Sequence, residues 1–156
     1  MTGKLQAAIR QRRPFPSLEA EAFLNLQRSA DALMRGLAEL LKPHDLSPTQ
    51  YNVLRILRGA EPDGLPCGEV GARLVTRDPD VTRLLDRMER RALLTRTRGP
   101  GDRRVVRARI AAEGLRLVNR LDGPIAGLHR GQLAHLGERR LRTLITLLEV
   151  ARQEDT

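Results

Sequence analysis

The sequence predicts a mainly α-helical protein with one small β-hairpin, an α+β fold. Apolar residues recur at helical spacing over most of the chain. Strand-like alternation replaces this period only near residues 93–110, around the strong turn signal Gly99-Pro100-Gly101-Asp102. The chain has 156 residues, of which 40% are hydrophobic. This length fits one domain, or one domain with an appended dimerisation element.

Residues 1–16 are predicted to form an N-terminal basic arm. A short apolar segment, Leu5–Ile9, precedes Arg10-Gln11-Arg12-Arg13, and Pro14 and Pro16 then stop any continuous helix. Three roles fit this arm: it lies across DNA, it packs on a partner subunit, or it is disordered.

Residues 17–46 are predicted to contain a long helix that begins after Ser17 and ends near Pro43. Glu19 and Glu21 lie in its first turn, where carboxylates favour the positive end of the helix dipole. The helix is long for so small a domain, so part of its apolar stripe is expected to contact another subunit.

Residues 47–114 are predicted to hold a helix-turn-helix followed by the hairpin. Ser47-Pro48-Thr49-Gln50 has the form of a capping box and starts a helix that ends at Gly59. Leu65 is expected to be a single strand residue that pairs with the hairpin. A short helix is expected near Gly68–Leu74, and Val75-Thr76-Arg77 is expected to be the turn after it.

The second helix of this motif is predicted to start with Asp78 as N-cap and Pro79 at its first position. Its apolar stripe is formed by Val81, Leu84, Leu85 and Met88. In the following hairpin Val106, Ala108 and Ile110 alternate with arginines. Two helices joined by a three-residue turn and followed by a basic hairpin indicate a winged helix-turn-helix, which projects its second helix into the major groove.

The charge distribution supports this interpretation. The net charge is +9, of which residues 77–109 hold +6 and residues 1–13 hold +4, so the rest of the chain is slightly acidic. Such clustering is the electrostatic pattern of a nucleic-acid-binding protein. The alternative is that the arginine-rich composition reflects coding bias and the charges are merely solvated.

Residues 115–156 are predicted to form two further helices, the second from Leu136 to Arg152. Gly123-Pro124 is expected to distort the first of them. Together with residues 17–46 they have more apolar surface than one small domain requires. We therefore expect N- and C-terminal dimerisation helices that interleave in a homodimer; the alternative is a monomeric helical cap.

From about Leu18 to the last helix, the chain resembles the multiple-antibiotic-resistance regulator (MarR) family of winged helix-turn-helix repressors. The resemblance is carried by Leu46–Tyr51 (LSPTQY), Val81–Glu89 (VTRLLDRME), the wing motif Asp102-Arg103-Arg104 and Gly114. Two positions depart from the family pattern. Ala92 stands where glycine commonly follows the recognition helix, and Ala111 replaces the threonine that usually caps the next helix.

The resemblance implies a two-lobed dimer that binds double-stranded DNA at a pseudo-palindromic operator. Its recognition helices enter successive major grooves and its wings enter the flanking minor grooves, so half-sites lie about one helical turn apart. Family members commonly repress their own or a neighbouring gene. Many release DNA when a small aromatic or phenolic effector binds between the lobes.

The candidate DNA-binding residues lie on the recognition helix, just before it and on the wing: Arg77, Thr82, Arg83, Arg87, Arg103 and Arg104. Arg83 is the best candidate for base readout, because arginine donates two bonds to guanine. Arg103 suits the narrow minor groove, and Arg77 suits a phosphate. By resemblance, Asp102 braces Arg104 or Arg77. Three more arginines are expected to contact phosphates non-specifically or not at all, namely Arg96, Arg98 and Arg107.

Phe23, His44 and Tyr51 fall where the lobes are expected to meet, so they are the candidate effector-pocket residues. Cys67 is expected near a helix N-terminus, which lowers the pKa of a thiol and can make it reactive, but the interpretation we favour is an inert small residue near a cap. The three histidines lack metal-ligand spacing, so neither a metal nor a cofactor is expected.

The sequence contains no nucleophile–base pair and no glycine-rich phosphate loop, so we do not expect an enzyme. No apolar run reaches membrane-spanning length, and one cysteine fits a reducing compartment, which predicts a cytoplasmic protein. The leading hypothesis is a homodimeric, sequence-specific transcriptional regulator. The alternative is a winged-helix protein-interaction module whose basic hairpin binds an acidic partner.

Overall fold

A computed structural model describes residues 3–153. The helices and strands follow one another in the order α1 (Lys4–Ala8), α2 (Leu18–Leu41), the 3₁₀ helix η1 (Lys42–His44), α3 (Pro48–Gly59), β1 (Leu65–Pro66), α4 (Cys67–Ala72), α5 (Val81–Arg90), β2 (Leu94–Arg98), β3 (Val106–Ile110), α6 (Ala112–Leu133), the 3₁₀ helix η2 (Ala134–Leu136) and α7 (Gly137–Arg152). The fold is mainly helical with a small three-stranded sheet, which confirms the predicted class.

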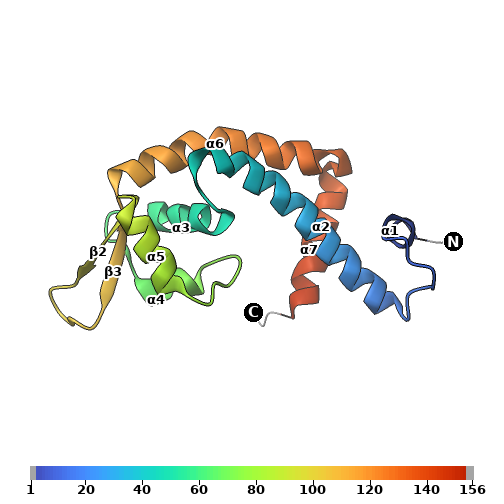
Figure 1. The fold of residues 1–156 in the computed structure, drawn as a ribbon, viewed down its shortest axis with the longest axis horizontal. Coiled ribbons are helices and arrows are strands. Elements are labelled where there is room, and N and C mark those ends of the chain that lie inside the picture. Colours follow the sequence, from blue (N-terminus) through green and yellow to red (C-terminus); the bar gives the residue numbers. More distant parts are fainter. Residues whose placement is uncertain (1–2, 154–156) are drawn as a thin grey trace.

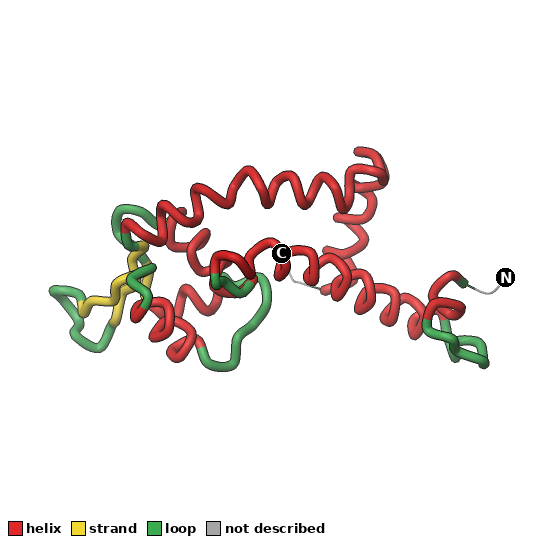
Figure 2. The backbone as a smooth tube through the Cα atoms, turned by 45° about the horizontal axis from the view of Figure 1, so that its top comes forward, coloured by secondary structure: helices red, strands yellow, loops and turns green. Residues whose placement is uncertain are grey.

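The molecule has a compact winged region and an extended helical part (Figure 1). Helices α3, α4 and α5 and the hairpin gather at one end, while α6 runs from the hairpin along the length of the molecule to α7. Helix α2 extends diagonally away from α3, and α1 lies at its far end. Figure 2 shows that the long loops are the hairpin tip, the α4–α5 connection and the arm after α1.

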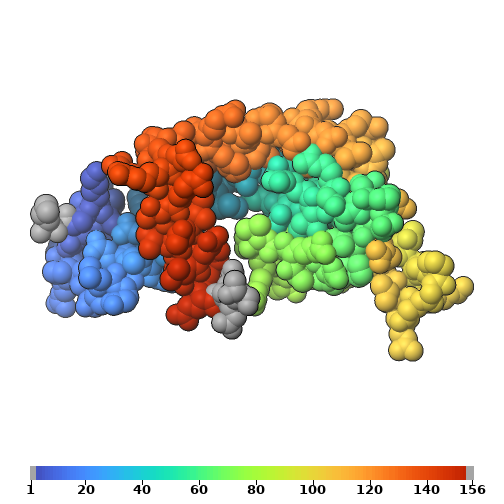
Figure 3. Space-filling view, turned by 180° about the vertical axis from the view of Figure 1, so that it is seen from behind, coloured from blue at the N-terminus to red at the C-terminus, as the bar shows by residue number. Residues whose placement is uncertain are grey.

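The core lies in the winged region. Its fully buried side chains come from helices α2 to α6 and from strands β2 and β3, and include Leu54, Leu57, Leu85, Met88 and Leu121. In contrast, α7 has no buried residue, and large apolar side chains of α2 and α7 are exposed. Figure 3 shows α7 standing apart from the winged region. The two terminal helices therefore leave apolar surface uncovered within one chain.

The sheet is antiparallel with the order β1-β3-β2. Leu65 pairs with Ala108, which confirms the expected single-strand partner of the hairpin. Ala108 and Ile110 are buried and Arg109 is exposed, so the predicted alternation is also confirmed. Strand β3, the second strand of the hairpin, begins at Val106, which leaves Arg103 and Arg104 in the hairpin tip.

The capping prediction at Ser47 is confirmed. Its hydroxyl accepts the Gln50 N–H at 3.1 Å, and the Gln50 side chain accepts the Ser47 N–H at 3.0 Å. Ser17 likewise caps α2 by accepting the Ala20 N–H at 3.1 Å. These local hydrogen bonds fix where the two helices begin.

The predicted start of the recognition helix was wrong by two residues. Asp78 does not cap it: its carboxylate accepts the Asp80 N–H at 2.8 Å and closes a local turn around Pro79. Asp80 is the N-cap of α5 and accepts the Arg83 N–H at 3.0 Å. The expected three-residue turn is also wrong, since residues 73–80 separate α4 from α5.

The N-terminal arm folds back on its own chain, an arrangement outside the three expected roles. Leu5 on α1 is only 7% exposed, and with Ile9 it lines one hollow together with Leu24 and Gln27 of α2. The basic side chains of the arm, Lys4 among them, remain exposed. Burial of Leu5 thus anchors a basic segment to the first half of α2.

The two departures from the family pattern have local consequences. Ala92 has a φ of 56°, so the chain leaves α5 through the left-handed conformation that glycine adopts more easily. Ala111 makes no side-chain cap to α6. Helix α6 nevertheless runs without interruption through Pro124, and the distortion expected there does not end the helix.

Candidate nucleic-acid interface

The recognition helix α5 has one buried and one charged side. Leu84, Leu85 and Met88 are 2%, 0% and 0% exposed and fix the helix on the core. Arg83 and Arg87 are exposed on the other side. Because the apolar stripe sets the rotation of the helix, the sequence itself determines which residues face outward.

Arg90 continues this basic stripe, and the sequence analysis missed it. Arg83, Arg87 and Arg90 are spaced i, i+4 and i+7, which places them on one helix face. Within residues 3–153, the side chains of Arg87 and Arg90 have no hydrogen bond or ion pair, and the Arg83 guanidinium makes only a 3.9 Å ion pair with Asp80. The helical spacing was the signal that identifies Arg90.

The other predicted contacts flank this stripe. Arg77 is exposed in the loop before α5, and Thr82 is exposed in its first turn. The loop is held to α3 by the Asn52 side chain, which accepts the Val75 N–H at 2.8 Å. Arg77, Thr82 and the arginine stripe are therefore all exposed.

The wing tip presents two exposed arginines, Arg103 and Arg104. Asp102 accepts the Arg104 N–H at 3.0 Å and lies 3.9 Å from its Nε, so the carboxylate braces the tip. The Arg98 guanidinium donates to the Arg103 carbonyl at 2.6 Å. Arg107 donates to the Gly64 carbonyl at 3.1 Å and secures β1 instead of facing a phosphate.

Arg96 is also directed inward. Its guanidinium bonds Asp86 and Glu89 of α5, and its side chain is only 19% exposed. Burial lowers the pKa of this guanidinium, but the hydrogen bonds to Glu89 and Asp86 outweigh it and raise the pKa above its ordinary value. Of the two expectations for Arg96, phosphate contact or none, only the second agrees with this position.

The three candidate effector-pocket residues do not line one cavity among the described residues. Tyr51 lines a cavity of about 390 Å³ with Met34 and Arg55. Phe23 is 65% exposed on α2, three helical turns before Met34. The His44 carbonyl instead accepts from Arg91 at 3.3 Å. The three candidates therefore lie in three different places among the described residues.

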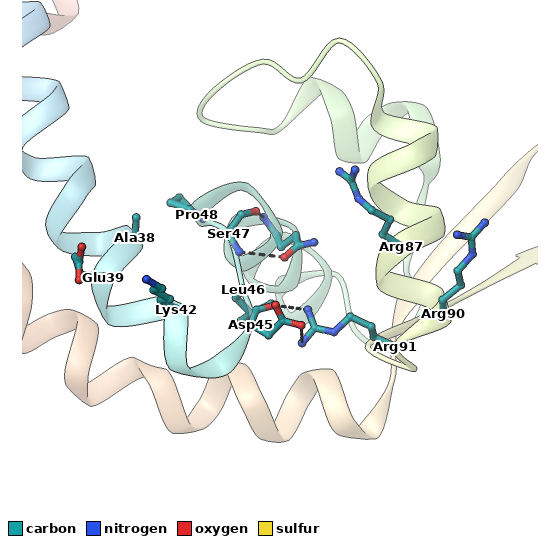
Figure 4. A pocket seen from close by; sticks show the side chains of 11 residues that line it. Ala38, Glu39, Lys42, Asp45, Leu46, Ser47, Pro48, Arg87, Arg90 and Arg91 are labelled. Atoms are coloured by element: carbon teal, nitrogen blue, oxygen red, sulfur yellow. Dashed lines mark hydrogen bonds and ion pairs between the residues drawn. The ribbon is translucent and has the colours of Figure 1, made fainter.

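A larger groove of about 780 Å³ lies between α2, the start of α3 and α5 (Figure 4). Lys42, Arg87, Arg90 and Arg91 line it together with two acidic residues, Glu39 and Asp45. Arg91 closes one end, because its guanidinium bonds the Asp45 and His44 carbonyls. The recognition helix is thereby tied directly to the corner between α2 and α3.

Cys67 begins α4 and is half-buried. Burial raises the pKa of its thiol above the ordinary value, although the nearby Arg96 charge opposes that shift. Of the two alternatives for Cys67, the raised pKa of the thiol favours the inert residue near a cap. Within the described part of the chain, no three acidic, histidine or cysteine side chains lie close enough to hold a metal ion.

Comparison with known proteins shows which proteins share this arrangement. The model of the MarR family matches residues 44–105. The solved structure of a MarR transcription factor from Planctomyces limnophilus is 40% identical, with 88% of this chain and 99% of that chain covered and a TM-score of 0.68. The homoprotocatechuate degradative operon repressor of Escherichia coli is 29% identical over 83% of this chain and 90% of its own length.

A third similar protein was solved with nucleic acid: the transcriptional repressor CouR bound to a 23-mer DNA duplex. It is 28% identical, covers 83% of this chain and 90% of its own, and has a TM-score of 0.71. The helix-turn-helix, basic wing and long terminal helices thus define a DNA-binding transcriptional regulator. The chain belongs to the MarR family.

Among residues 3–153, no helix is both long and apolar enough to span a membrane.

Proposed function

We propose that two copies of this chain form a repressor that binds a pseudo-palindromic operator. The observation that carries the proposal is the joint exposure of Arg83 on α5 and Arg103 on the wing tip. A recognition helix that enters the major groove and a wing that enters the flanking minor groove need cations at both places. An acidic protein partner would not require this paired arrangement. A chromosomal regulator acts in the cytoplasm of a bacterial cell, and we propose that location.

The apolar faces of the terminal helices support the homodimer. Leu26 and Met34 on α2 are 44% and 43% exposed, and Ile145, Leu147 and Val150 on α7 are 54%, 61% and 70% exposed. Apolar side chains of this size are stabilised when a partner removes them from water. A second copy offers the same two faces, and two-fold symmetry then matches a two-fold symmetric operator.

The proposed roles follow from position along the interface. Arg83 and Thr82, in the first turn of α5, read base edges, and Arg83 donates to guanine O6 and N7. Arg77, Arg87 and Arg90 bind phosphates that flank the major groove. In the wing, Arg103 and Arg104 enter the minor groove while Asp102 braces them.

We assign a small aromatic or phenolic effector to the cavity beside Tyr51. Its walls are apolar at Met34, Leu37 and Tyr51, and Arg55 and His129 supply polar atoms at its rim. The cavity joins α2 and α6 of the helical part to α3 and the α4–α5 loop. A ligand there changes the angle between the winged region and the helical part through which the two chains pair. This change of angle supports loss of DNA binding as the response.

The experiment is a DNA-binding titration with the region upstream of this gene and with unrelated DNA of the same length. We expect preference for the upstream fragment and an affinity that falls steeply with salt, since phosphate neutralisation releases counterions. Arg83→Ala is expected to remove most of the preference, while Arg103→Ala weakens both fragments more evenly.

The matched control is Arg120→Ala, which removes the same charge from the exposed side of α6, away from α5 and the wing. It is expected to leave the preference intact. If Arg120→Ala and Arg83→Ala behave alike, α5 does not read the operator. A mass measurement of the protein–DNA complex, with two chains expected per duplex, tests the dimer separately.

A further inference from the structure

The recognition helix has two acidic residues on a surface that is otherwise basic. Asp86 and Glu89 lie i+3 and i+6 from Arg83, and their side chains are 39% and 38% exposed. A carboxylate on a helix in the major groove faces a dense array of phosphates and lowers affinity by repulsion. Helix α5 therefore needs a counter-charge for these two residues.

Arg96 supplies that counter-charge from the adjacent strand β2. Its Nη2 bonds Asp86 Oδ1 and also Glu89 Oε1, the latter at 3.1 Å. Its backbone N–H donates to Glu89 Oε2 at 2.7 Å. One residue thus engages both acids through main chain and side chain together, and it joins the wing to the recognition helix.

The guanidinium is placed for this inward role and not for a phosphate. The Arg96 side chain is 19% exposed, and its Nε is buried and has no hydrogen-bond partner in the described part of the chain. A buried unpartnered N–H is unfavourable, so other interactions must hold the group in place. The paired carboxylates of Asp86 and Glu89 provide them.

We propose that Arg96 is a positioning residue that neutralises Asp86 and Glu89 and so reduces the repulsion between the recognition helix and the DNA phosphates. The proposal rests on the proposed binding of DNA by α5. It explains how one helix contains two acids without being repelled by the phosphates. It also predicts that Arg96 supports DNA affinity without contacting DNA.

The test uses the intact protein and the upstream fragment. Arg96→Ala leaves both carboxylates unpaired on α5, so we expect about tenfold weaker binding or more at low salt. Because the loss is a repulsion between partly exposed charges, it is expected to shrink as salt rises. Arg98→Ala is the matched single variant. It removes the same charge from the same side of β2, where the Arg98 guanidinium bonds only the Arg103 carbonyl among the described residues, and we expect roughly a two- to threefold loss.

The decisive variant is Arg96→Ala combined with Asp86→Asn and Glu89→Gln. If Arg96 acts by neutralising the two acids, removal of their charge restores affinity to within about threefold of the wild type. Its control combines Arg96→Ala with Glu61→Gln and Asp63→Asn. That variant has the same net charge, but its two amides lie in the exposed loop before β1, and it is expected to remain as weak as Arg96→Ala.

Thermal unfolding of each variant is measured alongside, so that affinity is compared only where the protein is folded. The proposal is overturned if the Asp86/Glu89 triple variant binds no better than its charge-matched control. It is also overturned if Arg96→Ala and Arg98→Ala lose the same affinity. If the wild type shows no preference for any DNA fragment, the proposed function fails instead, and the two failures are therefore distinguishable.

Discussion

Gly114 provides the sharpest structural prediction, because its hydrogen cannot be replaced by a methyl group without moving backbone. A Cβ on Gly114 would overlap the carbonyl oxygen of Leu93 and would lie 3.1 Å from both Ile110 Cγ1 and Leu54 Cδ2. The Leu93 oxygen cannot move freely, since it accepts the Ala111 N–H at 3.0 Å. The first turn of α6 must therefore shift away from the hairpin and α3.

The expected magnitude follows from two opposing effects. Overpacking a well-filled core costs roughly 1–3 kcal/mol, and a backbone obstacle places Gly114→Ala near the upper end. Alanine in place of glycine in a helix returns about 0.5–1 kcal/mol. We therefore expect a net loss of about 2 kcal/mol in the free energy of unfolding.

Gly127→Ala is the matched control on the same helix. Apart from the chain neighbours and the backbone of α6 itself, no atom of residues 3–153 lies within 4 Å of a Cβ built at Gly127. Only the helix propensity changes, so stability is expected to rise by about 0.5–1 kcal/mol. Urea unfolding followed by circular dichroism, at one fixed chain concentration, measures both variants. A Gly114→Ala protein as stable as the wild type would refute the close packing between α6 and the hairpin.

Three further predictions concern acid stability, thiol chemistry and assembly. Arg58 bonds Asp122 at 2.8 and 3.0 Å and lowers its pKa, so the pair stabilises the fold above the unfolded pKa of about 4. Arg58→Gln is expected to cost about 1 kcal/mol at pH 7, and urea unfolding should show this gap closing as the pH falls through the lowered pKa. Cys67, with its raised pKa, is expected to react with iodoacetamide at pH 7 several-fold more slowly in the folded than in the urea-unfolded protein, as followed by mass spectrometry. Ile145→Asp and Val150→Asp are expected to convert the proposed dimer to monomers, as measured by light scattering, because each buries a charge in the apolar α7 face.

Local signals in the sequence predicted most of the fold. Ser17 and the capping box at Ser47 fixed two helix starts, because each side chain bonds a backbone N–H three residues away. The Asp78-Pro79 pattern led to an error because Asp80 offers an equally good cap, and the sequence does not rank two aspartates that lie two residues apart. The turn length was wrong for this reason and because α4 ends at Ala72, two residues before the expected Leu74.

The sequence did not predict which side chains from different helices and strands contact one another. Arg96 belongs to the same basic segment as Arg98, and no local pattern distinguishes the one that bonds α5 from the one that faces solvent. Likewise, Tyr51 and His44 are only seven residues apart in the sequence. The 3₁₀ helix η1 ends at His44 and Asp45 has a left-handed backbone conformation, so the two residues have different surroundings. Such contacts depend on how elements pack and not on their spacing.

The net charge of a DNA-binding segment therefore overstates the charge it presents to DNA. Residues 77–109 hold eleven arginines. The guanidiniums of four of them donate to other parts of the protein, namely Arg91, Arg96, Arg98 and Arg107. The guanidiniums of the other seven are exposed and, within residues 3–153, make no contact closer than a 3.9 Å ion pair. The salt dependence of binding reports how many phosphates the protein neutralises, so these seven arginines set the upper limit of that dependence for each winged region. The four internally bonded arginines hold the structure in which the seven are exposed.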